Sequence, residues 1–232
     1  MTAIPSDSEI ASAVESLFSA TANCERINRW NALVPTDKQV PVLPPQGQKH
    51  VSNVPLREAE ETFAFIHDID ALLHRLSSTE GRIRMMLVGY CHIMESELIP
   101  SLIWNQLRLL HRLEPSWCFT RTTKKGETRA CWLPKDKYAE INRLAQPLSQ
   151  PIGNIVSAVW NGSLRNDFNH SRYFLSGTYV LGSGGLSPIS RSGAFRTGHS
   201  FRFDEVRERY RAAKALMSGV AKEHANACKN YK

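Results

Sequence analysis

Three polar residues in the second half of the chain, Arg165, Asn166 and His170, are the strongest candidates for chemistry. They stand in the run Ser163-Leu-Arg-Asn-Asp-Phe-Asn-His-Ser-Arg-Tyr173. An arginine offers a permanent cation and a planar set of donors that fit a phosphate group. A histidine is the one side chain that exchanges a proton near neutral pH without a perturbing environment. Residues of these types together are suited to cutting RNA.

RNA is cut without a metal when a base takes the 2′-hydroxyl proton and the oxygen attacks the adjacent phosphate. An acid then protonates the leaving oxygen. His170 is the natural acid or base, and Arg165 would neutralise the charge that gathers on the phosphate oxygens. Asn166 would orient His170 or hold the backbone. The expected product is a 2′,3′-cyclic phosphate end.

Helical geometry places these residues on different sides of one helix. Asn166 and His170 are four positions apart and share a face. Arg165 points roughly 140° away from His170 at about 100° per residue. One helix therefore cannot aim both side chains at one phosphate unless the arginine bends around it. Two antiparallel copies of the helix would solve this, so we expect a symmetric homodimer with a composite site.

The motif resembles the signature of the HEPN superfamily, whose active members carry an arginine, a polar residue, a short spacer and a histidine. Here these are Arg165, Asn166 and His170. The resemblance extends loosely to the helical layout of residues 56–232. It implies a metal-independent endoribonuclease without cofactor, built on a paired site, that acts as a toxin or in antiviral (phage) defence. A toxin would also need an antitoxin or other regulatory protein as a partner.

Other interpretations remain open from the sequence. Arg165 and His170 are also consistent with solvated residues near a helix end, or with a non-catalytic HEPN-like module that binds protein or nucleic acid. A third interpretation is a metal-dependent hydrolase, because His67, Asp70 and His74 recur at helical spacing and could share a metal. The ordinary alternative for this trio is a solvated helix face.

The charge balance favours an RNA partner. Lysine and arginine outnumber aspartate and glutamate by 29 to 22, which gives a net charge of +7 and a pI near 9.3. Such an excess is the electrostatic footprint of proteins that meet polyanions. The residues predicted to contact or steer RNA follow the motif or lie in expected loops: Arg172, Tyr173, Lys124, Lys125, Arg191 and Arg196.

Cysteine usage and hydropathy favour a cytoplasmic protein. The five cysteines are widely spaced and include no Cys-x2-Cys pair, which is typical of reduced thiols. A Cys118–Cys131 bridge remains possible if the two residues flank a hairpin. The first residues lack the basic and apolar regions of a secretory signal. No window of about 20 residues is free of charge, so we expect no membrane span.

The fold class expected from periodicity is mainly α, a HEPN-like helical bundle with one or two small β-hairpins. We divide the chain into an N-terminal amphipathic helix in 1–34, a connector in 35–55 that contains five prolines, and a helical domain in 56–232. Apolar residues at helical spacing predict a first helix over 6–30. Proline excludes regular helix from the connector.

Within 56–232 the helical pattern is interrupted by turn signals. We predict helices over 56–76, 80–113 with a kink or split at Pro100, 134–148, 152–174 and from Asp204 onward, with Asp204 as cap. Ser163 could cap a fresh start within 152–174. Hairpins are predicted over 117–133 and 178–203. Glu95 and Glu97 interrupt an apolar stretch, so each needs a partner, a cap role or water, and Arg165 is one candidate partner.

Overall fold

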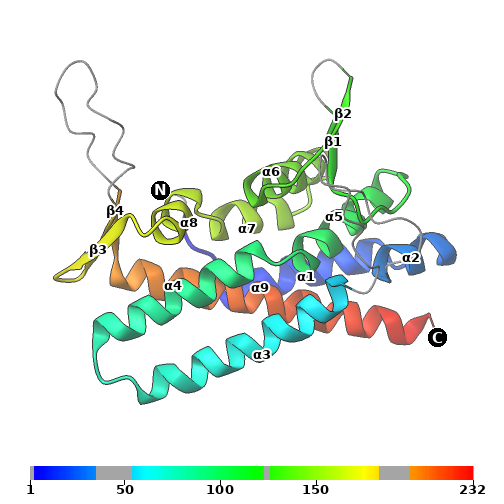
Figure 1. The fold of residues 1–232 in the computed structure, drawn as a ribbon. Coiled ribbons are helices and arrows are strands. Elements are labelled where there is room, and N and C mark those ends of the chain that lie inside the picture. The colour runs from blue at the N-terminus through cyan, green and yellow to red at the C-terminus, as the bar shows by residue number, and fades with distance from the viewer. Residues whose placement is uncertain (1–2, 35–53, 123–125, 183–198, 232) are drawn as a thin grey trace.

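The computed structural model describes residues 3–34, 54–122, 126–182 and 199–231. Within them the chain is mainly α-helical, with one two-stranded and one three-stranded antiparallel sheet (Figure 1). This confirms the predicted fold class. Lys124, Lys125, Arg191, Arg196 and most of the proline-rich connector lie outside the described residues.

The N-terminal segment forms two helices, α1 (Asp7–Ala20) and α2 (Arg26–Leu33), where the sequence pattern predicted one. Helix α1 begins at a capping box, in which the Ser6 side chain accepts from the Glu9 N–H and the Glu9 carboxylate accepts from the Ser6 N–H. Such reciprocal bonds satisfy donors that a helix start leaves open. Its buried stripe includes Ile10, Val14 and Leu17, and the helix packs along α9.

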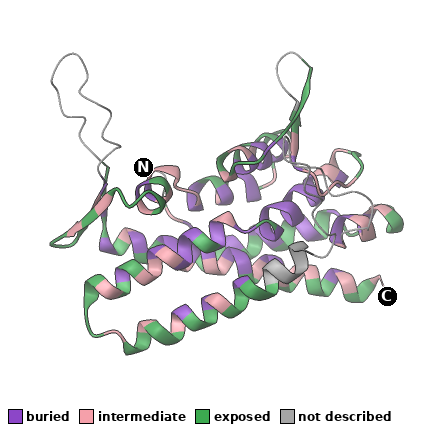
Figure 2. Ribbon diagram, in the orientation of Figure 1, coloured by how far each residue is buried: buried purple, intermediate pink, exposed green. Residues whose placement is uncertain are grey.

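Three long helices, α3 (Val54–Arg75), α4 (Thr79–Glu95) and α9 (Phe203–Asn230), run beside α5 (Leu98–Leu110) in the body of the molecule (Figure 1). The predicted helix over 80–113 is split between Glu95 and Leu98, just before Pro100. Proline fits the first turn of α5 because N–H groups there have no partner within the helix. Purple ribbon in Figure 2 marks the buried core, which α4, α5 and α9 share.

The predicted helix over 152–174 is also divided. Helix α6 (Pro134–Ala145) and a short 3-10 turn (Gln146–Leu148) lead to α7 (Ile152–Val159), and α8 (Gly162–Asn169) follows. Asn161 caps α8, because its Oδ1 accepts from the Leu164 N–H at 2.9 Å. The suggestion that Ser163 caps this helix is therefore wrong, since Ser163 already lies inside it.

The two hairpins are present, and one has gained a strand. The predicted turn region 117–133 contains β1 (Thr120–Thr122) paired with β2 (Thr128–Ala130). In the second sheet β4 (Tyr179–Gly182) pairs with β5 (Ser200–Arg202), as predicted, and also with β3 (Tyr173–Ser176). The first two residues of β3, Tyr173 and Phe174, are ones that the sequence pattern assigned to the end of a helix.

The last helix, α9, carries the predicted apolar stripe. Val206, Tyr210, Ala213, Met217 and Val220 are all buried. Its N-cap is Arg202, so Asp204 lies in the first turn rather than at the cap. Among the described residues, no helix is both long and apolar enough to cross a membrane.

Candidate functional site

Helix α8, which carries the motif, is fixed at its start by two side chains from the core. The Tyr90 hydroxyl donates to the Val159 carbonyl at 3.0 Å and accepts from the Asn161 N–H at 2.8 Å. Arg209 of α9 donates to the Ala158 carbonyl at 3.0 Å. These bonds satisfy backbone groups at the junction of α7 and α8, where neither helix supplies a partner. The junction is thus tied to both α4 and α9.

Glu95, the last residue of α4, holds the motif arginine. Its Oε1 accepts from Arg165 Nε in a salt bridge and from Asn169 Nδ2 at 2.5 Å. The pairing of Glu95 with Arg165 that the sequence suggested is therefore confirmed. Both partners are partly exposed, so the guanidinium lies at the protein surface. Glu97, the other acid of this stretch, forms a salt bridge with Lys137.

Asn166 belongs to the same cluster, which we call the Glu95 cluster (Glu95, Arg165, Asn166 and Asn169). Its Oδ1 accepts from Arg165 Nη1 at 3.1 Å. This bond fixes the arginine, and the role predicted for Asn166, to orient His170 or hold the backbone, stays a prediction. Two donors of the guanidinium are thereby set in direction, which reduces the freedom that Arg165 would lose on meeting an anion.

Cys91 and His92 precede Glu95 by about one turn of α4. Burial, with a smaller effect of Glu95 that Arg165 opposes, raises the pKa of the Cys91 thiol to about 12. Burial also lowers the pKa of His92, against the attraction of Glu95, and its ring stacks at a tilt on Phe65 with centroids 4.5 Å apart. Near neutral pH Cys91 is therefore a thiol and His92 a neutral ring.

His170 stands where α8 ends. Its own N–H donates to the Asn166 carbonyl at 3.1 Å, and the next two N–H groups close the helix: Ser171 to Phe168 at 2.9 Å and Arg172 to Asp167 at 2.7 Å. Ser171 has a φ of 51°, the left-handed conformation that this type of helix end requires. His170 is exposed at this corner, so its imidazole is open to solvent.

Arg165 and His170 have different surroundings in the structure. Arg165 turns toward α4 and is engaged by Glu95, whereas His170 sits at the far end of α8 as an exposed cap residue. The Arg165 guanidinium also reaches Asn166, which shares a helix face with His170. The homodimer expected from the sequence stays a prediction.

Asp167 is a residue of this region that the sequence did not single out. It is 6% exposed, and its Oδ2 is buried with no hydrogen-bond partner among the described residues. Burial raises the pKa of its carboxyl, and attraction to His199 and Arg172 opposes that rise. Only glycine fits opposite at position 182, since a Cβ there would come within 1.9 Å of Asp167 Oδ2. An aspartate in a short polar helix gives no sequence signal of such burial.

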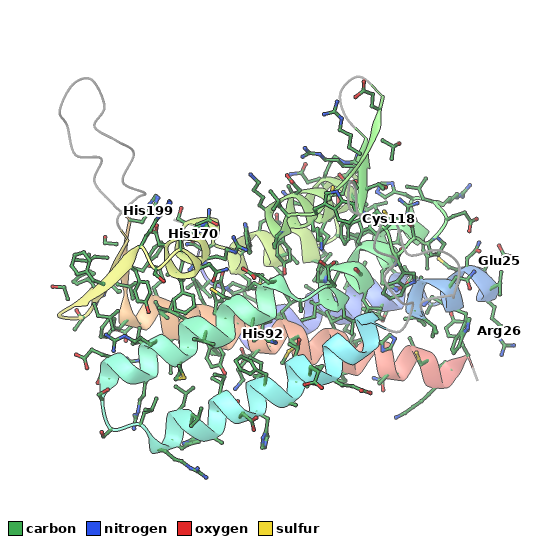
Figure 3. The ribbon with its side chains drawn as sticks, in the orientation of Figure 1. Glu25, Arg26, His92, Cys118, His170 and His199 are labelled. Atoms are coloured by element: carbon green, nitrogen blue, oxygen red, sulfur yellow. The ribbon has the colours of Figure 1, made fainter. Side chains whose placement is uncertain are left out.

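The predicted substrate-binding residues Arg172 and Tyr173 differ in their exposure to solvent. Arg172 is exposed directly after the helix end, near His170. Tyr173 is half-buried and packs on Phe168 with ring centroids 5.3 Å apart, so its ring is engaged by the protein. Figure 3 labels His170 and His199 at the end of the molecule where α8 meets the three-stranded sheet. His199 was not predicted as part of the site.

The alternative metal site gains no support from the described residues. Asp70 is occupied, because its carboxylate accepts from the Tyr210 hydroxyl at 2.9 Å and forms a salt bridge with Lys214. His67 is an exposed neighbour of Asp68. Across the described ranges, no group of three or more histidine, cysteine or acidic residues is arranged to hold a metal ion.

The cysteines of the first hairpin do not form the bridge that the sequence left possible. Cys118 and Cys131 are free thiols, although they flank β1 and β2. Burial is the main cause that raises the pKa of both thiols, to about 11 for Cys131. Both are therefore protonated near neutral pH and are poor nucleophiles.

Comparisons with protein-family models, with curated proteins and with solved structures gave no significant match to this chain.

Proposed function

We propose that the protein is a metal-independent endoribonuclease that cuts RNA through attack of the 2′-hydroxyl on the neighbouring phosphate. His170 would act as the acid or base, and Arg165 would neutralise charge on the phosphate oxygens. The observation that carries the proposal is the combination of an exposed His170 with a surface Arg165 that Glu95 and Asn166 fix in direction. A preset cation is what stabilisation of a charged transition state needs.

The proposal includes a homodimer in which two copies of α8 contribute to one cleft. It rests on the helical positions of Arg165 and His170, whose directions from the helix axis differ by roughly 140°, so that two copies of α8 would bring an arginine and a histidine together more easily than one. The resemblance to HEPN proteins supports the same pairing. A role as a toxin or in phage defence rests on that resemblance alone.

Cleavage in the presence of a chelator tests the proposal. A mixture of tRNA, mRNA and structured RNA is incubated with purified protein in excess EDTA, beside a His170→Ala variant shown to be folded. We expect wild-type cleavage with 2′,3′-cyclic phosphate ends. The variant should be slower by about 10²- to 10⁴-fold, the range for loss of a general acid or base. His67→Ala, an exposed histidine on α3, is the matched control and should cleave normally.

Equal cleavage by wild type and His170→Ala would remove this histidine from the mechanism. Absence of cleavage on all three RNAs would favour the rival function, a non-catalytic helical module that binds protein or nucleic acid. One observation favours that rival: the Arg165 guanidinium already bonds two protein groups, as an arginine that merely holds α8 against α4 would. The rival predicts that His170→Ala keeps full binding of its partner.

A further inference from the structure

The three-stranded sheet beside the motif has two different faces. Strand register pairs Phe174 with Leu181 and Ser200 in one row, and Ser176 with Tyr179 and Arg202 in the next. Alternation along each strand sends these six residues to the same side. The opposite side carries Leu175, Val180 and Phe201, of which the last two are buried. The sheet therefore packs one face on the protein and turns the other to solvent.

The outer face of the sheet displays two aromatic rings. Phe174 is 59% exposed and Tyr179 is 42% exposed, both far above what their apolar rings would reach in a core. They lie diagonally across β3 and β4, at a Cα separation of roughly 7–8 Å for such neighbours. A pair of exposed aromatics on a sheet marks a binding surface more often than an isolated one does.

The charges on this face suit an anionic partner. Arg202 is exposed and lies directly across from Tyr179, so a cation and a ring stand side by side on neighbouring strands. None of the six outward residues is acidic. Arg172, also exposed, precedes β3 and adds a second cation at its entry. An alternation of rings and cations is the usual composition of surfaces that hold single-stranded nucleic acid.

The sheet begins close to the candidate site in the chain. Only Ser171 and Arg172 separate the exposed His170 from the first residue of β3. We propose that the outer face of β3–β5, through Phe174, Tyr179 and Arg202, binds single-stranded RNA and presents it to the site around His170. This inference rests on the proposed function for its substrate and names the class of that substrate. Bases paired in a duplex cannot stack on side chains, whereas unpaired bases can.

Binding is measured with a probe that the proposed reaction cannot cut. A fluorescein-labelled, mixed-sequence 2′-O-methyl oligonucleotide lacks the free hydroxyl, so affinity is separated from turnover. We expect Phe174→Ser with Tyr179→Ser to weaken binding at least about tenfold, given about 1–3 kcal/mol per stacked base. Phe174→Tyr with Tyr179→Phe keeps both rings and should bind as wild type. Trp132→Ser, which removes a ring that is 44% exposed near the other hairpin, is the matched control.

A duplex of the same sequence should bind less well and should not distinguish the variants. Arg202→Gln should lower the slope of log Kd against log salt by about 0.7, the value for one phosphate contact on a single strand. Equal affinity of wild type and the double serine variant would overturn the inference. Conversion of a dimer to a monomer by that variant would overturn it too, because the face would then be a contact between two copies.

The outcomes separate the inference from the proposed function. Loss of oligonucleotide binding in the double serine variant, with no RNA cleavage by wild type, would keep the single-strand surface and refute the nuclease. Cleavage that needs His170 but is unchanged in KM by the serine pair would keep the nuclease and refute the surface. Circular dichroism and thermal unfolding of each variant check that the overall fold is kept.

Discussion

Two carboxylates at the surface of the helical bundle gather donors in the same way but have different surroundings. Asp70 on α3 accepts from Tyr210 and Lys214 of α9, and Glu95 on α4 accepts from Arg165 and Asn169 of α8. Both salt bridges are partly exposed. The donors of Asp70 belong to a 28-residue helix that a buried stripe holds in place. Those of Glu95 belong to an eight-residue helix in which only Leu164 and Asp167 are buried.

The difference between the two donor helices indicates which set of polar contacts determines the position of its helix. Burial of apolar side chains is the main stabilising effect for α9, so the Asp70 contacts add little to its position. Helix α8 has little apolar area to bury, and its cap, the Tyr90 hydroxyl and Glu95 must therefore define its place. Substitutions in the polar contacts of α8 should change the candidate site, whereas equivalent changes around Asp70 should change stability alone.

The largest contrast is expected between Glu95→Gln and Asp70→Asn. Loss of the Glu95 charge releases Arg165, and cleavage of RNA in EDTA should fall by about 10- to 100-fold, the scale of effect for a misplaced group. Stability should change by only about 1 kcal/mol, since the pair is partly exposed and the glutamine keeps an oxygen that can accept from Arg165. Asp70→Asn should leave cleavage unchanged. Similar cleavage activity of the two variants would show that the contacts of Glu95 matter no more for the candidate site than those of Asp70.

The buried anchor of α8 is tested by Tyr90→Phe with Tyr210→Phe as its control. Removal of the Tyr90 hydroxyl leaves the part-buried Asn161 N–H without its partner and takes one donor from the Val159 carbonyl. We expect the free energy of unfolding to fall by about 1–3 kcal/mol. The Tyr210 hydroxyl bonds a partly exposed carboxylate, so its removal should cost less. Urea unfolding measures both; an equal loss would mean that the α7–α8 junction is no more sensitive than α9.

Asp167→Asn tests the buried face of α8 through its dependence on pH. Because burial raises the pKa of Asp167, its contribution to stability is complete below the ordinary value of 3.8 and is lost as the pH rises through the raised pKa. The asparagine stays neutral and avoids that loss. We therefore expect the free energy of unfolding of the variant to rise relative to that of wild type as the pH increases from about 4 to 7. Thermal unfolding of both proteins at each pH measures this difference. A gap that is constant with pH would contradict the raised pKa.

The smallest effect is expected at the end of α8. Ser171 has a φ of 51°, and Ser149, remote from the motif in sequence, has a φ of 52°. Glycine takes this conformation without the steric cost of a Cβ, so each serine-to-glycine change should stabilise the protein by about 0.5 kcal/mol. RNA cleavage should be unaffected by either change. If Ser171→Gly alone altered cleavage, the turn that carries His170 would itself be part of the site.

One contact of the candidate site could be suggested, though not decided, from the sequence. Glu95 stands in an apolar stretch and therefore needs a partner, and the motif arginine, Arg165, was one candidate for it. Asn169 and Asp167 were missed, since a polar residue in a short helix gives no indication of which way it faces. His67, Asp70 and His74 have the spacing of a possible metal site, which the sequence left open as an alternative, but the Asp70 carboxylate is engaged by Tyr210 and Lys214 of α9.

The sequence by itself determined the mainly α-helical class, the apolar stripes of α1 and α9, the break before Pro100 and the two hairpins. These follow from periodicity, proline and turn residues, which act over a few neighbouring positions. Only the tertiary structure decided that Glu95 meets Arg165, that Asp167 is buried against Gly182 and that residues 173–176 form a strand. Such contacts join segments far apart in the chain, and they exist only once α4, α8, α9 and the sheet are packed together.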